Sequence, residues 1–332
     1  MKLDSARELK QRVKENILAS PTFIRGSAFR LPTPGRTRGA LEPAFAVGVS
    51  RNADTNEYSL ALRVRSKDDL NRPELSQALA MAHGEVDLRY TGSVSRLSAP
   101  WHQQINRPLL VGGSIGHYMT TAGTVGGFVC PKGQPQGDIF VLSNNHVLAE
   151  ENLGQHGDDI FQPAPYDGGT SADTVASLDK FITLAPSGNL VDAAIGRISP
   201  TVRYDVKKLT GLGTLSGLSG VDVDVGLLVS KLGRTTGLTH GRVTAFELDD
   251  VAIAYDLGVI KFDSQIEIES VETDPIPFSS GGDSGSLIVD ENLGAVALLF
   301  AGSETGGTNG AGLTYASPIQ TVLDLLQIDL LF

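Results

Sequence analysis

The spacing of hydrophobic residues changes along this chain of 332 residues. Near the start, Leu9, Val13 and Ile17 recur at helical spacing, which predicts an amphipathic helix over residues 5–18. The segment 25–43 that follows is rich in proline, glycine and basic residues and shows no such period. It is typical of an extended connector.

The next elements predicted by the pattern complete a small unit. Residues 45–50 and 58–65 alternate apolar and polar positions around a polar turn, which predicts a β-hairpin. A short helix over 73–83 and a further alternating segment over 85–97 follow. We therefore expect a small α+β domain over residues 1–100, in which no motif carries chemistry.

The texture of the chain is different from residue 101 onwards. Short apolar stretches are separated by glycine, which predicts many antiparallel strands closed into barrels; they span 126–129, 139–142, 227–232, 258–262, 286–289 and 295–300. Near the end, Ser317, Pro318 and Gln320 predict a helix start with a cap, a first-turn proline and a capping-box glutamine. We expect a mainly β domain over 101–332 that ends in one helix.

Composition indicates a soluble globular protein. Hydrophobic residues make up 41% of the chain and charged residues 20%, and the apolar runs are too short for membrane-spanning helices. No secretory signal follows Met1, and a single cysteine, Cys130, excludes an internal disulfide and fits a reducing compartment. We expect a cytoplasmic protein with no membrane partner.

The net charge of −11 is unevenly distributed. Residues 1–100 carry 16 Lys and Arg against 11 Asp and Glu, whereas the remainder carries 11 against 27. An acidic protein is a poor candidate for non-specific nucleic-acid binding, so the basic N-terminal part is the only candidate for such contact. We favour the alternative that this part docks on the acidic remainder of its own chain or on a protein partner.

A glycine-rich segment over 281–286 contains the first candidate for chemistry, Ser284. Its sequence, Gly-Gly-Asp-Ser-Gly-Ser, allows a sharp turn that exposes the serine hydroxyl. The amides of Gly282 and Ser284 could then point at one spot and form an oxyanion hole. The same pattern occurs in ordinary turns, so a catalytic serine would also need a base.

His146 and Asp192 are the candidates for that base and its partner. His146 follows a buried-looking strand, where rigid structure can position an imidazole as general base. Asp192 lies within the apolar segment 190–195, and a buried carboxylate is costly unless an imidazole or another donor is its partner. A turn residue beside Asn189 is the alternative for Asp192.

The segments around His146, Asp192 and Ser284 resemble the three catalytic motifs of chymotrypsin-like (trypsin-like) serine proteases. Their order is that of the family, and the separations of 46 and 92 residues are close to those expected of it. The resemblance covers about 107–332. It implies a double six-stranded antiparallel β-barrel and a serine endopeptidase that acts through a His-Asp-Ser triad and an acyl-enzyme, on a protein or peptide substrate and without cofactor or metal.

Residues 233–237, Gly-Arg-Thr-Thr-Gly, are similar to a segment of bacterial streptogrisin and α-lytic-type proteases. The resemblance implies that Arg234 pairs with Asp283, so that the site forms without N-terminal cleavage. The alternatives are a surface arginine in a hairpin, or cleavage before a segment at 110–113 that resembles an activated N-terminus. The lone cysteine also makes the chain similar to intracellular trypsin-like peptidases of bacteria.

Analogy to the family places a specificity pocket around Phe278, six positions before Ser284, with Phe300, Gly302 and Gly312 in its walls. Because Phe278 is not an acid, a preference for Lys or Arg is not expected and an apolar preference is. The competing class of function is a protein-binding scaffold on a protease fold, in which catalysis is weak or absent.

Overall fold

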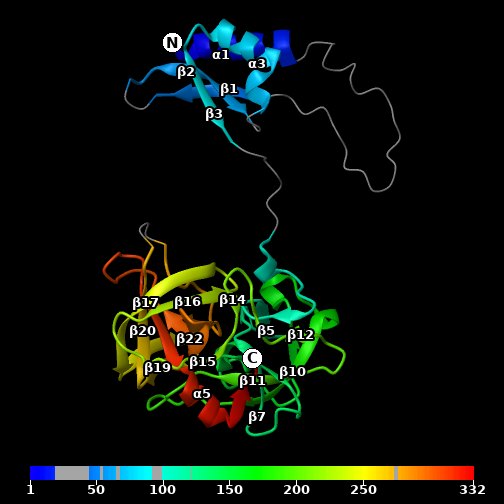
Figure 1. The fold of residues 1–332 in the computed structure, drawn as a ribbon, viewed down its shortest axis with the longest axis vertical. Coiled ribbons are helices and arrows are strands. Elements are labelled where there is room, and N and C mark those ends of the chain that lie inside the picture. The colour runs from blue at the N-terminus through cyan, green and yellow to red at the C-terminus, as the bar shows by residue number, and fades with distance from the viewer. Residues whose placement is uncertain (19–44, 53–54, 65–67, 92–98, 121, 273–275) are drawn as a thin grey trace. The chain divides into compact units, whose positions relative to one another are not determined.

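The computed structural model of the chain describes residues 1–18, 45–52, 55–64, 68–91, 99–120, 122–272 and 276–332 (Figure 1). The chain divides into two compact units, Met1–Ser98 and Ala99–Phe332. The connector expected over 25–43 lies outside the described residues.

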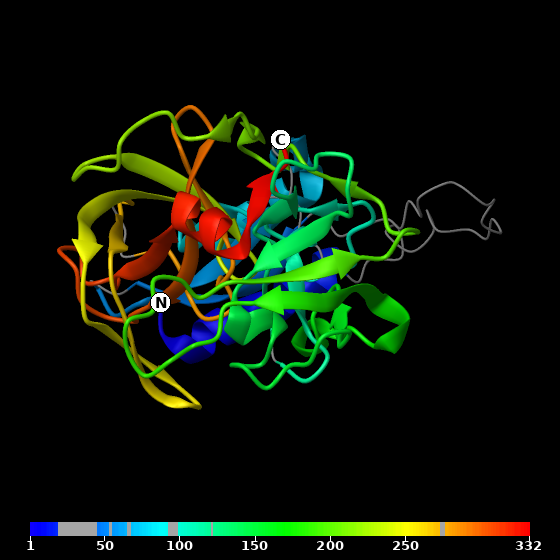
Figure 2. The same ribbon diagram turned by 90° about the horizontal axis from the view of Figure 1, so that it is seen from below.

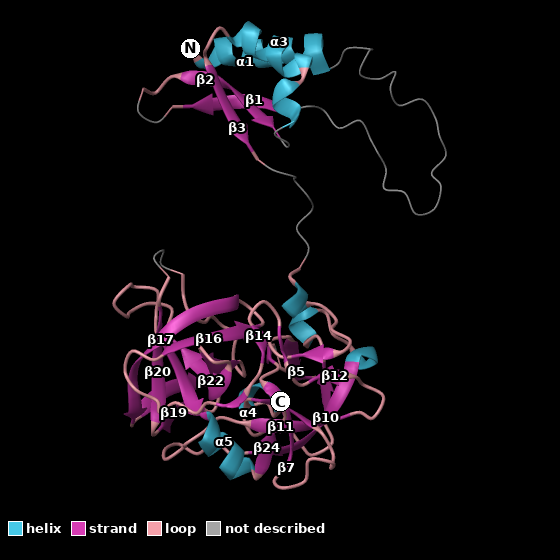
Figure 3. Ribbon diagram, in the orientation of Figure 1, coloured by secondary structure: helices cyan, strands magenta, loops and turns pink. Residues whose placement is uncertain are grey.

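The first unit packs two helices on one face of a three-stranded sheet (Figure 3). Its elements are α1 (Leu3–Val13), a π-helical turn (Lys14–Leu18), β1 (Phe45–Arg51), β2 (Tyr58–Val64), a 3₁₀ turn (Asp68–Asn71), α3 (Pro73–Ala82) and β3 (Val86–Tyr90). The first helix, the hairpin and the second helix are thus confirmed. Leu60, Leu62 and Val64 alternate along β2 and are fully buried against Val13 and Ala78 of the helices.

An open sheet in the second unit holds the strands in the order β24-β7-β8-β11-β10-β9-β5-β6. These strands are β5 (Ser114–His117), β6 (Gly123–Thr124), β7 (Gly127–Pro131), β8 (Phe140–Ser143), β9 (Asp159–Phe161), β10 (Thr174–Phe181), β11 (Ala194–Ile198) and β24 (Ile328–Leu330). A one-turn helix, α4 (Asn145–Leu148), follows β8.

A closed six-stranded barrel forms the rest of the second unit, because β22 and β23 pair and close the order β22-β21-β16-β17-β20-β23. The strands are β16 (Leu228–Gly233), β17 (Gly237–Leu248), β20 (Gln265–Ser270), β21 (Leu287–Asp290), β22 (Gly294–Gly302) and β23 (Thr314–Pro318). The short β15 (Gly217–Leu218) pairs with β22 outside this ring, and β18 (Val251–Tyr255) and β19 (Gly258–Phe262) form a separate hairpin.

The mainly β, double-barrel fold is therefore confirmed, with one closed barrel and one half-barrel. The half-barrel ends at the two-residue strand β6, where the amide of Thr124 donates to the carbonyl oxygen of Ser284 at 2.8 Å. The loop that contains Ser284, which belongs to the closed barrel, thus bonds β6 at the edge where a further strand would pair. Side chains from both sheets, among them Leu142, Leu232 and Leu298, belong to one continuous core.

The terminal helix forms as α5 (Ile319–Leu326, red in Figure 2), beside β22 and β23, but its expected cap is wrong. Pro318 is the N-cap, and the Ser317 hydroxyl donates to Gln265 instead, at 2.9 Å, because Ser317 belongs to β23. The side chain of Gln320 bonds Asp324 rather than the cap. Gln327 ends the helix with a φ of 57°, after which the chain returns as β24.

None of the helices among the described residues is both long and apolar enough to cross a membrane.

Candidate active site

His146 lies in α4, directly after β8, an inner strand of the half-barrel. Its Nδ1 is 2.5 Å from Oδ2 of Asp192, and 21% of its side chain remains exposed. The imidazole is therefore held on one side and accessible on the other, as a general base requires.

Asp192 is fully buried in the segment before β11. Its Oδ1 accepts hydrogen bonds from the amides of Asn145 at 2.6 Å and His146 at 3.4 Å. Its Oδ2 accepts from the His146 ring and from the hydroxyl of Tyr255 at 2.7 Å. These donors satisfy the hydrogen-bonding needs of a buried carboxylate. Asp192 is therefore not an exposed turn residue.

The environment of His146 raises the pKa of its imidazole above the ordinary value of 6.5. Burial lowers the pKa, but the charge and hydrogen bond of Asp192 raise it by more, with a smaller contribution from Glu151. An imidazolium is thus stabilised at this position, which is the state a general base passes through.

The loop that carries Ser284 needs glycine for its shape. Gly282 has a φ of +94°, and a methyl group added there would lie 2.6 Å from the Thr235 hydroxyl and 3.1 Å from Nη1 of Arg234. Gly285 has a φ of +90°. Both values favour glycine strongly, so the turn is specified by the sequence.

Three main-chain amides of this loop, those of Gly281, Gly282 and Ser284, have no acceptor among the described residues. The amides of Asp283 and Gly285 donate to main-chain carbonyl oxygens at 3.0 and 2.8 Å. Those of Gly282 and Ser284 make no hydrogen bond to any described residue. These are the two donors that the sequence suggests for an oxyanion hole.

The Ser284 hydroxyl donates to the carbonyl oxygen of Phe300 at 3.4 Å, and no bond among the described residues joins it to His146. The two segments nevertheless meet at β6. A methyl group added at Gly123 would overlap Val147, the residue after His146, and would lie 3.0 Å from the Ser284 carbonyl oxygen. The structure thus brings both chain segments close to Gly123, without a bond between the Ser284 hydroxyl and the imidazole.

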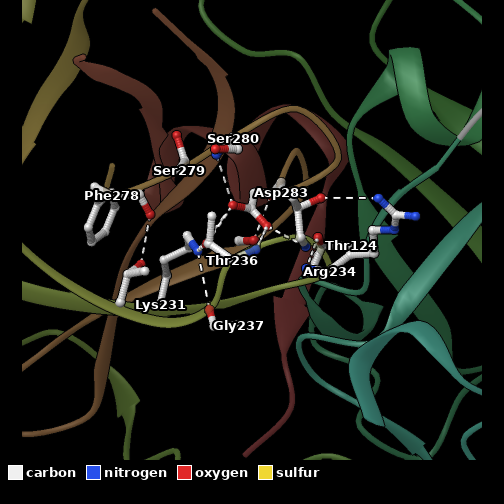
Figure 4. A network of polar contacts seen from close by, with 12 residues as sticks. Thr124, Lys231, Arg234, Thr236, Gly237, Phe278, Ser279, Ser280 and Asp283 are labelled. Atoms are coloured by element: carbon white, nitrogen blue, oxygen red, sulfur yellow. Dashed lines mark hydrogen bonds and ion pairs between the residues drawn. The ribbon is translucent and has the colours of Figure 1, made fainter. Parts of the chain in front are cut away.

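The expected ion pair between Arg234 and Asp283 is wrong. Asp283 is fully buried, and its nearest cation is Lys231, whose Nζ is 3.3 Å from Oδ2 (Figure 4). The amides of Thr235 and Thr236 donate to Oδ1 at 2.7 and 3.1 Å, and the Thr236 hydroxyl and the Ser280 amide donate to Oδ2. Both carboxylate oxygens of Asp283 are bonded to these donors, and neither forms an ion pair with Arg234.

Arg234 pairs with Asp167 instead. Its Nε is 2.8 Å from Oδ2 of Asp167 and its Nη2 bonds the other oxygen, a two-pronged contact that suits the guanidinium fork. This hydrogen bonding raises the pKa of Arg234. Because its Nη1 lies where a Gly282 side chain would be, Arg234 still supports the serine loop by packing.

Lys231 is a residue that the sequence interpretation missed. It interrupts the apolar strand β16 and is fully buried, with Nζ 5.8 Å from the centre of the Phe278 ring. Burial lowers the pKa of its ammonium, and the charge of Asp283 opposes that effect. A lysine between Val229 and Leu232 was the available signal, because such a residue needs a buried anion.

The expected walls of the specificity pocket are mostly wrong. A cavity of about 280 Å³ borders Ser284, lined by Ser279, Ser280, Ala301, Gly302, Ser303 and Glu304 among others. Of the expected residues only Gly302 lines it. Phe278 is buried in the barrel core, and Phe300 packs against Phe262 with tilted rings whose centres are 4.6 Å apart. Gly312 turns the loop against Ser303. The cavity is small and its lining is mixed, with serines and Glu304 beside Pro277, Leu299 and Ala301.

A second cavity of about 360 Å³ borders His146. Three exposed apolar side chains and three acidic ones line it: Met119, Leu153, Leu257, Glu150, Glu151 and Asp256. Within the described ranges, no group of three or more His, Cys, Asp or Glu is placed to hold a metal ion.

Comparison with known proteins finds no matching family model and no matching curated protein. Among solved structures, the chain is similar to Thermobifida fusca Protease A, at 16% identity and a TM-score of 0.46 over 67% of this chain and 98% of that one. It is also similar to a glutamic acid specific serine protease, at 20% and 0.48 over 67% and 100%. For Nocardiopsis protease the values are 19% and 0.47 over 68% and 99%.

These similarities concern the fold alone. The closed barrel and half-barrel of the second unit form a chymotrypsin-like fold, as its own strand pairing shows. Any activity has to be argued from the site.

Proposed function

We propose that this chain is a serine endopeptidase with His146, Asp192 and Ser284 as its catalytic triad. The observation that carries the proposal is the buried Asp192 carboxylate bonded to the partly exposed imidazole of His146. The unpaired amides of Gly282 and Ser284 in the glycine-rich loop support it.

The reaction follows from these groups. Rotation of the Ser284 side chain away from the Phe300 carbonyl brings its hydroxyl to Nε2 of His146, and such bonds often form only with substrate. His146 takes the hydroxyl proton while Ser284 attacks the peptide carbonyl, and the amides of Gly282 and Ser284 bind the oxyanion. His146 then protonates the leaving amine and later activates the water that hydrolyses the acyl-enzyme.

We propose further that the enzyme is active without cleavage near residue 109. Asp283 already has a buried cation in Lys231, so it needs no new terminal ammonium. The amide of Leu109 already has a hydrogen-bond acceptor. It donates to the carbonyl oxygen of Arg203 at 2.8 Å, where β4 (Leu109–Leu110) pairs with β12 (Tyr204–Asp205).

A fluorophosphonate probe on the full-length chain tests both proposals. We expect a mass increase of one probe on the intact chain, located at Ser284 and absent in Ser284→Ala. Ser284→Ala should also lower kcat for peptide hydrolysis on the order of 10⁶-fold, because the hydroxyl is the nucleophile. Ser216→Ala is the control, since that hydroxyl bonds Asn292 on the surface and should leave labelling unchanged.

Two results would contradict the proposals. Full-length chain that binds protein but never reacts with the probe would favour the scaffold function. Labelling that begins only after removal of residues up to about 109 would retain the triad and disprove activity without cleavage.

A further inference from the structure

The hairpin β18–β19 reaches the candidate triad although it carries none of its members. Its strands form a two-stranded sheet of their own, and Phe262 makes a single bridge to Asn189. Asp256 and Leu257 form the turn between Tyr255 and Gly258. The Tyr255 hydroxyl is 2.7 Å from Oδ2 of Asp192, the same oxygen that bonds the His146 ring. The tyrosine ring also meets the imidazole edge to face, at 5.8 Å between centres and an angle of 74°.

Contacts at both ends of the hairpin fix this tyrosine. On one side its ring packs on Phe262, which is fully buried and in turn contacts the ring of Phe300. At the tip, the Leu257 amide donates to the carboxylate of Glu151 at 3.0 Å. The ring therefore has little freedom to leave Asp192.

The hairpin is also bonded to the segment that leads to Asp192. The side-chain amide of Asn189 donates to the carbonyl oxygen of Lys261 at 2.8 Å, and the Asp263 amide donates to the carbonyl oxygen of Asn189 at 2.8 Å. Tyr255 and Asp192 are thus parts of one bonded assembly, since Asn189 lies three residues before the aspartate.

We propose that Tyr255 is a positioning residue of the candidate triad, whose hydroxyl shares Oδ2 of Asp192 with the imidazole and so sets both the orientation and the proton affinity of His146. The proposal rests on the proposed function. A phenol has one proton, and burial and the charge of Asp192 raise the pKa of Tyr255, so its hydroxyl donates and does not ionise.

Removal of the hydroxyl changes the charge that His146 meets. With one donor fewer, Oδ2 carries more unshared negative charge, which favours the imidazolium. The other charged groups near the ring are Glu151, which contributes to its pKa, and Glu150 and Asp256 in the adjoining cavity. None of these changes in Tyr255→Phe, so a shift would report the hydroxyl.

The test is an NMR titration of His146 in full-length wild-type protein and in Tyr255→Phe, with the Nδ1 proton resonance as a second signal. We expect the pKa of His146 to rise by about half a unit in the variant. In the active enzyme, kcat should fall about 10-fold with little change in KM, and the acidic limb of kcat/KM should move to higher pH with His146.

Tyr315→Phe is the matched control. Tyr315 packs against the same aromatic cluster, but its hydroxyl bonds Glu267. It should leave the titration of His146 unchanged. Replacement of Tyr255 by 3-fluorotyrosine, a stronger donor of nearly the same shape, should lower the pKa of His146, an opposite shift that lost packing could not produce.

Identical His146 titration and Nδ1 resonance in wild type and Tyr255→Phe would overturn the proposal, even if the protein is an active protease. If the chain has no protease activity, the titration still decides the role of Tyr255. A shift in both tyrosine variants would also overturn it, since it would show a general effect on packing.

Discussion

Two fully buried aspartates, one in each half of the candidate site, differ in the cation that each one faces. Asp192, on the half-barrel side, and Asp283, on the closed-barrel side, both accept from main-chain amides, one hydroxyl and one basic side chain. The basic side chain is His146 for the first, 21% exposed, and Lys231 for the second, fully buried.

The difference separates a proton carrier from a structural ion pair. An imidazole changes charge near neutral pH and can move a proton when it reaches solvent or substrate. An ammonium closed off beside its carboxylate has no such access, and serves to neutralise the charge that fixes the serine loop. Two carboxylates buried in a similar way therefore have different roles. Asp192 supports proton transfer by His146, and Asp283 holds the loop of Ser284 in place.

Thr124 joins the two halves. Its amide donates to the carbonyl oxygen of Ser284, and its own carbonyl oxygen accepts from the Ser143 hydroxyl at 2.8 Å. Its hydroxyl donates to the carbonyl oxygen of Gly282 at 3.0 Å and accepts from the Arg234 amide at 3.0 Å. One residue of β6 thus couples the strand before His146 to the loop of Ser284.

Asp192→Asn should have the largest effect in this comparison. An amide no longer accepts the Nδ1 proton as a carboxylate does, so we expect kcat to fall on the order of 10⁴-fold with little change in melting temperature. The control is Asp158→Asn, because Asp158 pairs with His117, a histidine that is 1% exposed, at 3.0 Å. Equal losses in the two variants would show that any His-Asp pair in this half matters only for folding.

Lys231→Met should remove most stability and most activity together. It leaves Asp283 buried without a cation, which costs about 3–5 kcal/mol and loosens the Gly282 turn. Adding Asp283→Asn should recover much of the stability, because no charge then remains unpaired, but not the activity. Chemical denaturation and kcat measurements would check this, and wild-type stability of Lys231→Met would contradict the role of the pair.

Gly233→Ala tests how closely the second aspartate is packed. A methyl group there would overlap Oδ1 of Asp283 and lie 2.9 Å from Nζ of Lys231, so we expect a loss of about 1–3 kcal/mol. Gly220→Ala is the control, since no atom lies within 4 Å of the added methyl group. Equal denaturation midpoints in the two variants would show that Asp283 and Lys231 can move to accommodate the methyl group without loss of stability.

The sequence predicts the half of the site that depends on local pattern. His146 follows a strand, Ser284 lies among glycines, and Asp192 interrupts an apolar segment, so each is visible in the chain itself. The partners of Arg234 and Asp283 are not visible in this way, because Asp167, Lys231 and Thr236 lie far from them in the sequence and meet them only in the folded chain. Tyr255 was missed for the same reason.

The pocket and the end of the chain show a similar limit. Counting back from Ser284 places Phe278 at the cavity, but a buried ring in the barrel core cannot line it. The capping-box pattern at Ser317 fits a helix start, yet the hydroxyl is used within the barrel by Gln265. In both cases a local rule yields to a tertiary contact.

The pH dependence of kcat/KM and of stability should both report the titration of His146. The folded pKa of His146 lies above 6.5, so kcat/KM should rise as pH increases through that raised value, where the imidazole becomes a neutral base. The stability from the His146–Asp192 pair should be complete below about pH 6.5 and should be lost as pH rises through the folded pKa. An acidic limb centred below 6.5 would contradict the assignment of His146 as the base.

Glu151→Gln should give the smallest effect of these variants, a shift in the pKa of His146. Its charge raises the pKa of His146 less than Asp192 does, so we expect the acidic limb of kcat/KM to move down by a few tenths of a unit. Glutamine keeps an oxygen that can accept from the Leu257 amide, so the tip of the hairpin should stay in place. Glu150→Gln is the control, because Glu150 lines the same cavity but lies beside His117, and its variant should shift the limb less. Equal shifts would mean that the net charge of the cavity, and not the position of Glu151, sets the proton affinity of His146.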